Sequence, residues 1–188
     1  QKLRLTMKTN KILGLFVSSI FLSLLFLTLT ACSGGGGGGS DFVGAALVNL
    51  DASPRKLDPG DRMRVTLRFQ EAHSDGVLMK FKFPEGLSYV PATSFLEVRG
   101  DDLDIDPLFN VQATDKSKYL VYEINESKLK KETSGTLVFE LLAVSETKEG
   151  LLEVDPDVDN RSIPNTTEFS VETPEFNAED DISFEIVD

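Results

Sequence analysis

The feature that most constrains the fold is a strict alternation of apolar and polar residues between Arg62 and Phe69. Every second side chain is apolar, and the polar positions between them hold three arginines and one threonine. A period of two places successive side chains on opposite faces of a strand, whereas a helix would need a period of about 3.6. We therefore expect a half-buried antiparallel strand with one apolar face and one cationic face.

Short segments of the same kind recur between turn residues along the rest of the chain. They cover residues 45–50, 77–83, 87–90, 95–98, 119–124, 137–144, 151–154, 169–171 and 182–187. Helical spacing is confined to residues 126–132, which would form a single turn at most. Roughly seven to nine short strands separated by turns predict an all-β protein, built as an antiparallel β-sandwich.

Residues 41–188 are expected to form this sandwich as one domain. A segment of this length can bury a single hydrophobic core without covalent cross-links between cysteines. Cys32 is the only cysteine of the chain. An intramolecular disulfide is therefore impossible, and side-chain packing must hold the fold together.

The charge distribution excludes one class of partner. The first 40 residues hold four basic side chains and no acidic ones, so residues 41–188 carry 15 basic and 31 acidic side chains, a net charge of −16. A nucleic-acid-binding surface needs clustered lysines and arginines that neutralise phosphates. We expect no nucleic-acid partner and no domain lying flat on anionic lipid.

Residues 1–31 have the composition of an export signal. Residues 1–6 form an extension upstream of Met7, where we expect translation to start. Lys8 and Lys11 then precede a long apolar run over residues 12–30. A positive segment, an apolar segment and a small-residue site in this order predict a signal peptide. A retained transmembrane helix is the alternative, because the run is long enough to span a bilayer.

The end of this run, Leu29-Thr30-Ala31-Cys32, resembles the lipobox of bacterial lipoproteins. The resemblance implies cleavage before Cys32 and lipidation of its thiol by a diacylglyceryl group, usually with an N-acyl chain such as palmitate. Several acyl chains suffice for stable anchoring in a membrane. In the sorting pattern of that family, Ser33 favours the outer membrane where the host has one. The alternative is a chance Ala-Cys at the end of a transmembrane helix.

Residues 32–40 join this anchor to the domain. Six consecutive glycines between Ser33 and Ser40 predict a flexible tether without side chains that could order it. A phosphate-binding glycine loop would need a preceding strand and a following helix, which the flanking residues do not supply. We therefore interpret the glycines as a tether.

Two segments of the domain resemble a known family. Phe83–Thr93, with the sequence FPEGLSYVPAT, and Asp58–Met63, with DPGDRM, are similar to the signatures of the family named domain of unknown function eleven. The resemblance implies an immunoglobulin-like (Ig-like) sandwich of the kind found in surface proteins of bacteria and archaea. The Asn-x-Gly signature of that family is missing from residues 70–76. Gly135–Phe139 resembles a late strand of cohesin modules, which are the rival family.

Two runs of carboxylates are candidate calcium sites. They are Asp101, Asp102, Asp104 and Asp106 in one expected loop, and Asp155, Asp157 and Asp159 in another. Asp-x-Asp-x-Asp spacing suits Ca²⁺, which takes six to eight oxygen ligands in irregular geometry, but neither run has the glycine and glutamate of an EF-hand loop. The alternative is a solvated acidic rim.

Nothing else in the sequence points to catalysis. His73 is the only histidine, and no glycine-flanked serine accompanies it, so we interpret it as a loop residue. The chain is thus expected to be a non-enzymatic lipoprotein of the bacterial envelope with an adhesive, structural or assembly role. Its expected partners are the membrane, through the lipid anchor, and a protein or glycan of the envelope. A calcium- or carbohydrate-dependent binding module like cohesin is the alternative, followed by an envelope hydrolase.

Overall fold

The computed structural model describes residues 45–114, 116–158, 169–170, 172 and 174–187. The chain divides into two compact units, residues 1–41 and Phe42–Asp188, and every described residue belongs to the second. The predicted signal, Cys32 and the tether lie outside the described residues, as does Asp159. Within the described residues, no helix has the length and apolar character needed to cross a membrane.

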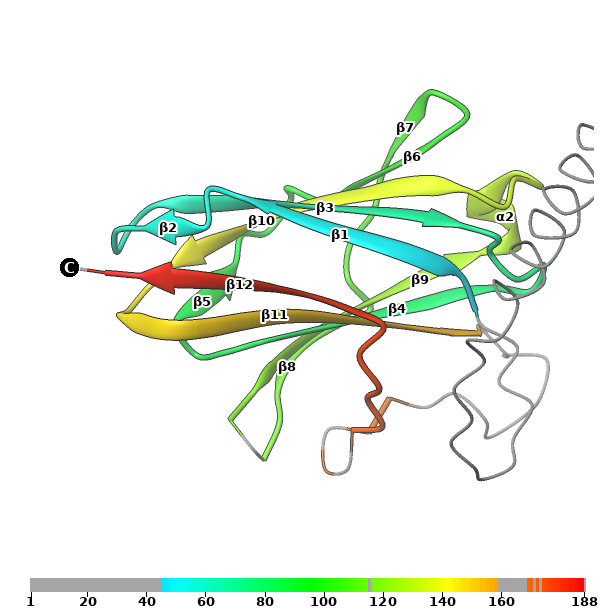
Figure 1. Ribbon diagram of the computed structural model, residues 1–188. Coiled ribbons are helices and arrows are strands. Elements are labelled where there is room, and N and C mark those ends of the chain that lie inside the picture. Colours follow the sequence, from blue (N-terminus) through cyan, green and yellow to red (C-terminus); the bar gives the residue numbers. More distant parts are fainter. Residues whose placement is uncertain (1–44, 115, 159–168, 171, 173, 188) are drawn as a thin grey trace, which may run out of the picture. The chain divides into compact units, whose positions relative to one another are not determined.

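The described residues form twelve strands and one short helix (Figure 1). The strands are β1 (Leu47–Ser53), β2 (Lys56–Leu57), β3 (Arg62–Gln70), β4 (Gly76–Phe83), β5 (Leu87–Tyr89), β6 (Phe95–Val98), β7 (Asp101–Asp104), β8 (Phe109–Gln112), β9 (Lys118–Asn125), β10 (Gly135–Ala143), β11 (Thr147–Val158) and β12 (Asp180–Ile186). The helix, α2 (Glu126–Leu129), is the single turn that the sequence predicts. Asn125 caps it by accepting a hydrogen bond from the backbone N–H of Lys128.

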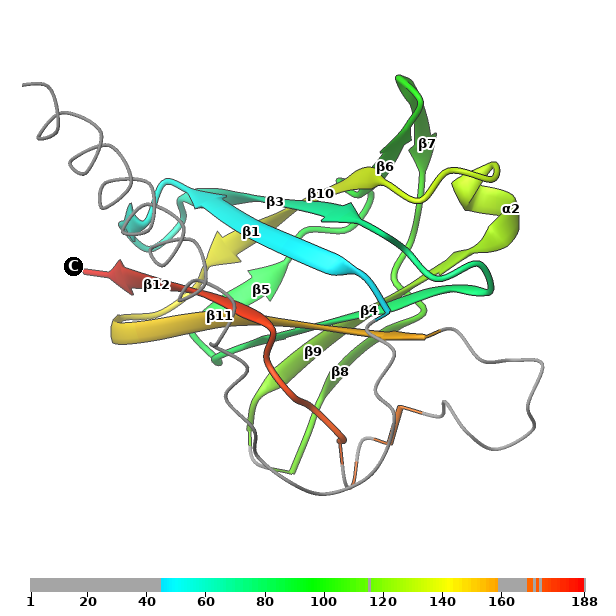
Figure 2. The same cartoon turned by 45° about the vertical axis from the view of Figure 1, so that its right-hand side comes forward.

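The strands pair into two sheets that face each other, as two views show (Figures 1 and 2). Sheet A has the order β1-β3-β10-β6-β7, and β5 also pairs with β10. Sheet B has the order β2-β12-β11-β4-β9-β8. Among the described pairings, β2 with β12 is parallel and the others are antiparallel. The predicted all-β, Ig-like antiparallel sandwich is confirmed.

The alternation in β3 sets the orientation of sheet A. Met63, Val65, Leu67 and Phe69 are buried, whereas the three arginines between them are exposed. β1 and β10 pair with β3 on either side, so the apolar face of β3 is turned toward sheet B. The prediction of one apolar face and one cationic face is confirmed.

Aromatic side chains join the two sheets across the core. Phe139 of sheet A lies 4.8 Å from Phe81 of sheet B between ring centroids, with the rings at 75°. The ring centroid of Tyr122, also in sheet B, lies 5.6 Å from that of Phe139. All three are fully buried, and aromatic pairs of this geometry stabilise a core by about 0.5–1.5 kcal/mol beyond the area that they bury.

One polar chain of contacts crosses this core. The hydroxyl of Ser94 lies 2.9 Å from the Tyr89 hydroxyl and 2.8 Å from the Tyr122 hydroxyl. Burial raises the pKa of the Tyr122 hydroxyl far above its ordinary value, so this tyrosine stays neutral. The network satisfies buried hydroxyls that would otherwise destabilise the sandwich.

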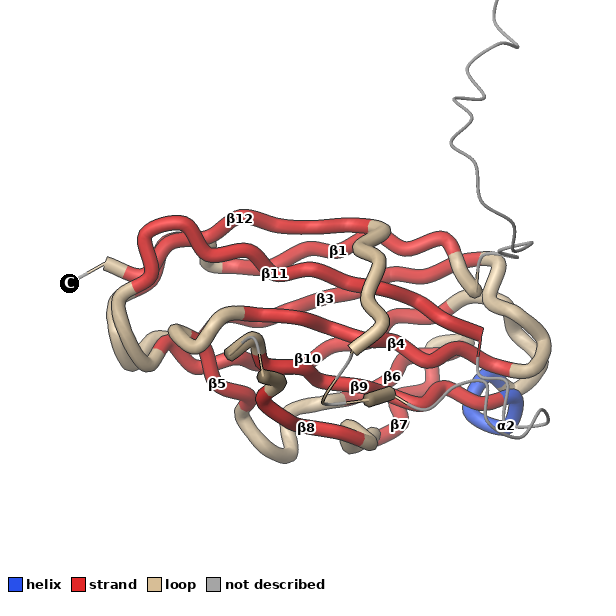
Figure 3. The backbone as a smooth tube through the Cα atoms, turned by 90° about the horizontal axis from the view of Figure 1, so that it is seen from below, coloured by secondary structure: helices blue, strands red, loops and turns tan. Residues whose placement is uncertain are grey.

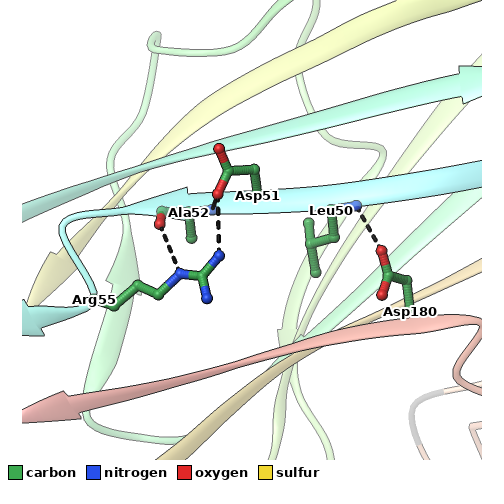
Figure 4. A network of polar contacts seen from close by, with 5 residues as sticks. All are labelled: Leu50, Asp51, Ala52, Arg55 and Asp180. Carbon is green, nitrogen blue, oxygen red and sulfur yellow. Dashed lines mark hydrogen bonds and ion pairs between the residues drawn. The ribbon is translucent and has the colours of Figure 1, made fainter.

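A hydrogen bond from the backbone to a side chain joins the two sheets at one side of the sandwich (Figure 4). The backbone N–H of Leu50, in β1, donates to Oδ2 of Asp180, the first residue of β12, at 2.7 Å. β1 is an outer strand of sheet A and β12 belongs to sheet B. The contact therefore ties the two sheets together where no ladder of backbone hydrogen bonds joins them.

Several segments differ from the sequence prediction, which did not include β2 and β8. Asp101–Asp104, expected in a loop, forms β7, which pairs with β6 as the second strand of a hairpin. Residues 155–158, also expected in a loop, continue β11, which pairs with β4 as far as Val158. Phe169 and Ser170, expected in a strand, have no regular structure. Acidic residues disfavour strands by local propensity, and pairing with β6 in one case and with β4 in the other overrides that preference.

Candidate functional site

The outer face of sheet A carries the arginines of β3. Arg62 donates to Glu140 of β10 at 2.8 Å, and the two side chains are 60% and 30% exposed. The guanidinium of Arg64 lies 5.5 Å from the ring centroid of Phe95 in β6. Arg68 is also exposed on this face. Three cations thus run along β3, an interior strand of sheet A, in a domain whose net charge is strongly negative.

Carboxylates border these arginines on the β6–β7 side. In the register of the hairpin, Asp102 lies opposite Glu97 and Asp104 lies opposite Phe95. Directly opposite residues of an antiparallel pair point to the same face, so both aspartates share the outer face with Arg64 and Arg68. We call the three arginines and this acidic border the bipolar face, defined by Arg62, Arg64, Arg68, Glu97, Asp102 and Asp104.

The first predicted calcium site is divided by the strand that contains it. Asp101 and Leu103 point to the opposite side of β7 from Asp102 and Asp104, because side chains alternate along a strand. Asp101 makes an ion pair with Lys130 at 3.0 Å, and Asp106 lies exposed beyond the end of β7. The structure therefore does not bring these four carboxylates together on one side.

The second predicted calcium site holds a lysine instead. Lys80 of β4 lies directly opposite Asp155 of β11, with its Nζ 2.7 Å from Oδ2 of that residue. The same Nζ lies 2.5 Å from Oδ2 of Asp157. The Lys80 and Asp155 side chains are only 4% and 2% exposed. An ammonium group thus lies where a metal ion between these two carboxylates would be expected.

Residues 174–178, which we call the covering segment, bury this cluster. Figure 3 shows the loop that leads into β12 crossing β11 and β4. The carbonyl of Glu175 accepts a hydrogen bond from Nζ of Lys80 at 2.7 Å. The backbone N–H of Asn177 donates to Oδ2 of Asp155 at 2.8 Å. The outer face of sheet B is therefore covered at this point.

Aromatic contacts hold the covering segment against sheet B. The Phe176 ring lies 5.8 Å from Tyr119 of β9 between centroids and 5.5 Å from Nζ of Lys82. Phe169 lies 5.2 Å from the same tyrosine and 5.8 Å from Phe109 of β8. These rings form an apolar cover over a sheet face that the strand pattern alone would leave in water.

The electrostatics of Asp155 follow from this cover. Burial raises the pKa of the Asp155 carboxyl above its ordinary value, and hydrogen bonds from Lys80 and Asn177 oppose the rise. Its Oδ1 is buried and has no hydrogen-bond partner among the described residues. A buried acceptor without a partner destabilises a protein by about 1–3 kcal/mol. Asp155 is therefore the one buried side chain of the described chain with an unsatisfied polar atom.

Calcium binding stays a prediction. No group of three His, Cys, Asp or Glu side chains suited to a metal ion occurs within the described residues. Asp159, the third member of the second run, lies outside them. Binding of Ca²⁺ at Asp155 and Asp157 would have to displace Lys80.

A surface depression of about 670 Å³ lies beside β11, β12 and β2. It is wide open, and each of its three cations is already paired with a neighbouring carboxylate. The pairs are Arg55–Asp51 at 3.2 Å (Figure 4), Lys56–Glu185 at 3.0 Å and Lys148–Glu146 at 3.8 Å. Polar groups that already satisfy one another do not converge on a substrate, as they would in an active site.

His73 lies in the turn between β3 and β4. Its Nδ1 accepts a hydrogen bond from the backbone N–H of Asp75 at 3.2 Å, and its backbone N–H donates to the carbonyl of Ala45 at 2.9 Å. These contacts stabilise the turn and the start of the domain.

The sequence predicts the positions of only some residues of the bipolar face and of the buried lysine cluster. The outward position of the β3 arginines follows from the period-two alternation alone. Lys80 and Lys82 also alternate with buried residues, so the sequence placed them on an outward face but gave no sign of a cover. Glu175 lies 95 positions from Lys80 along the chain, and no local pattern links them.

No protein-family model and no curated protein matches the chain. The resemblances to domain of unknown function eleven and to cohesin therefore remain resemblances.

Among solved structures, the chain is similar to the N-terminal domain of the Streptococcus gordonii adhesin Sgo0707. The TM-score is 0.50 at 14% identity, over 74% of this chain and 32% of that one. The chain thus spans about a third of the length of that adhesin structure. At this level of identity the similarity shows the fold, a β-sandwich of the Ig-like class.

Two further structures align at lower TM-scores. AvmM, which catalyzes macrocyclization in alchivemycin A biosynthesis, aligns with a TM-score of 0.45 at 12% identity, over 77% of this chain and 89% of that one. A cohesin module of a Clostridium perfringens glycoside hydrolase aligns with a TM-score of 0.45 at 9% identity, over 76% of this chain and 96% of that one.

Proposed function

We propose that this chain is a lipid-anchored protein of the bacterial envelope whose β-sandwich binds a protein partner without catalysis. The observation that carries the proposal is the bipolar face of sheet A. The arginines of this face are exposed, and ion pairs and the covering segment do not take up all of them. Arginine is one of the residue types enriched in protein interfaces. Among the described residues, the outer face of sheet B is partly closed by the covering segment, and sheet A presents the more open face.

The charge pattern favours a protein over a polyanionic glycan. A uniformly acidic polymer would be attracted to the central arginines but repelled by Glu97, Asp102 and Asp104 along the border. A folded protein can present acidic groups to the centre and basic groups to the border, and like-charge contacts at an interface are unfavourable. The partner expected here therefore carries both signs of charge.

A binding role also agrees with what surrounds the bipolar face. β7 ends sheet A, and its outer edge pairs with no other strand among the described residues. An unpaired strand edge can accept an added strand from a partner through main-chain hydrogen bonds. The aspartates on this edge disfavour pairing with the same edge of a second copy, because two rows of carboxylates would repel.

The absence of catalysis is part of the same proposal. The depression beside β12 offers cations that are already paired, and the buried polar cluster under the covering segment is closed to a substrate. Those two features support a module that recognises a partner and offers no site at which an external substrate would be converted. An adhesive, structural or assembly role at the cell surface fits such a module.

The lipid anchor rests on Cys32 and is tested separately. Replacing Cys32 with serine removes the thiol that the lipid would modify. Incorporation of labelled palmitate into the full chain should be lost, and the protein should leave the membrane fraction. Unchanged labelling and fractionation would contradict the anchor while leaving the binding proposal standing.

The binding face is tested with paired double variants of the full chain in its native envelope. Arg64→Ala/Arg68→Ala should lose a co-purifying partner that the wild type retains. Lys56→Ala/Lys148→Ala removes two exposed cations elsewhere on the domain and should retain it. Equal recovery from both double variants would contradict the assignment of the bipolar face.

A further inference from the structure

The buried cluster of Lys80, Asp155 and Asp157 under the covering segment has more polar contacts than a simple ion pair. Nζ of Lys80 has three oxygen acceptors, on Asp155, Asp157 and the Glu175 carbonyl. Oδ2 of Asp155 accepts from both Lys80 and the backbone of Asn177. Its other oxygen, Oδ1, is buried and has no partner among the described residues. As an ion pair, the cluster therefore satisfies the ammonium but leaves half of the carboxylate unsatisfied.

An amide between the same two side chains would satisfy every atom. Its nitrogen would keep one hydrogen, which the Glu175 carbonyl is placed to accept. Its carbonyl oxygen, the former Oδ2, would keep the hydrogen bond from the Asn177 backbone. The unsatisfied Oδ1 would be gone. Asp157, whose side chain is 32% exposed, would be left within reach of water.

We propose that Lys80 and Asp155 condense into an intramolecular amide bond that joins β4 to β11. This is a modification site of the domain itself and does not depend on the proposed binding function.

The reaction needs no oxidant, reductant or co-reactant. The lone pair of a neutral Nζ attacks Cγ of the protonated Asp155 carboxyl, and the bond from Cγ to Oδ1 breaks. Nζ gives up one of its two hydrogens, and Oδ1 leaves with two hydrogens as water. Starting from the ion pair, one ammonium and one carboxylate give one amide and one water, so atoms and charge balance.

The neighbours of the cluster supply what this step requires. Asp157, with Oδ2 2.5 Å from Nζ, can take the proton from the nitrogen and pass it to the departing oxygen. The Asn177 N–H lies on Oδ2 and can stabilise the negative charge that develops there during attack. The covering segment keeps water away from the cluster, and such an environment favours a neutral carboxyl group over a carboxylate. Burial acts in the same direction on Asp155, whose pKa it raises.

Peptide mapping of the denatured full chain tests the bond. Trypsin does not cleave after an acylated lysine, so Lys80 should stay uncut within residues 69–82. That peptide should be joined to residues 149–161, which contain Asp155. The expected mass is the sum of the two peptides minus one water, with fragment ions that locate the link at Lys80 and Asp155.

Three variants separate this link from other causes. Lys80→Met should abolish the joined peptide. Lys82→Met removes the next lysine on the same face, which pairs with Glu153 at 3.0 Å, and should retain the link, in a longer tryptic peptide that ends at Arg99. Asp157→Asn should fold normally and yield the two peptides unlinked. A joined peptide in that variant would overturn the proton-transfer role assigned to Asp157.

Mild acid provides a chemical test that needs no variant. Cleavage of an Asp–Pro bond by acid requires a free aspartate carboxyl, and the chain contains three such bonds, at Asp58, Asp106 and Asp155. In the denatured wild type, the first two should be cleaved and the third should resist. Cleavage at all three, together with tryptic cutting after Lys80, would overturn the proposal and leave Lys80–Asp155 as an ion pair only.

Discussion

Replacing Phe176 with alanine should release the covering segment from sheet B. Phe176 is half-buried and contacts Tyr119 and Lys82. Full burial of a phenylalanine stabilises by about 1.5–3 kcal/mol, so half burial contributes roughly 1 kcal/mol. The contact with Tyr119 adds about 0.5–1.5 kcal/mol and that with Lys82 about 0.5–1 kcal/mol. Allowing for incomplete additivity, opening of the segment should become easier by about 2 kcal/mol.

Hydrogen exchange at residues 174–178 measures that opening directly. The Asn177 N–H is held by Asp155 at 2.8 Å, so it exchanges only when the segment lifts. A loss of about 2 kcal/mol corresponds to exchange roughly 30-fold faster. Glu175→Ala is the matched control, because the exposed side chain of Glu175 is removed while its carbonyl still accepts from Lys80. That control should exchange at the wild-type rate.

An unchanged exchange rate in Phe176→Ala would refute this reasoning. It would mean that the polar contacts of Glu175 and Asn177 hold the segment without the aromatic ring. Faster exchange in Glu175→Ala by the same factor would contradict it in another way, since the side chain would then be part of the closure.

Three further predictions concern the sandwich and the carboxylates. In Gly135→Ala, the new methyl group would lie 2.7 Å from the Phe69 ring, so the free energy of unfolding measured in urea should fall by about 1–3 kcal/mol. A urea midpoint equal to that of the wild type would be inconsistent with this packing. Asp180→Ala removes the charge-assisted hydrogen bond from the Leu50 N–H and should lower the free energy of unfolding by about 1.5–3 kcal/mol. Asp180→Asn keeps an acceptor and should lower it less. Equal losses in the two variants would rule out the hydrogen bond as the cause. Calorimetric titration of the full chain with millimolar Ca²⁺ should give heat if either carboxylate run binds calcium as predicted, and no heat would end that prediction.

Local physics was sufficient to predict the main strands. In β3, the period of two over Arg62–Phe69 specifies both the strand and its buried face, because a shift by one residue would place arginines in the core. Residues 95–98 were predicted with the observed bounds, and the Pro84–Gly86 turn separates β4 from β5 as expected. These elements depend on side chains close together in the sequence.

The elements that the sequence did not predict depend on pairing and contacts that their own residues do not signal, and several of these partners are distant along the chain. β7 is a run of aspartates around one leucine, and only its pairing with β6 makes it a strand. The last residues of β11 are acidic and contain Pro156, yet Lys80 and β4 hold them in the sheet. The covering segment has no periodicity at all, and its position follows from contacts with a strand about a hundred residues earlier.

Site-specific photo-cross-linking from the bipolar face tests the central claim most directly. A photoreactive residue at Thr66, between Arg64 and Arg68, faces outward from sheet A. The same residue at Leu151, exposed on the outer side of sheet B, is the matched control. In the native envelope, the full chain should form an adduct with one protein partner from position 66 and none from position 151. An adduct from position 151 alone, or adducts of equal yield from both positions, would contradict the claim that sheet A is the binding face.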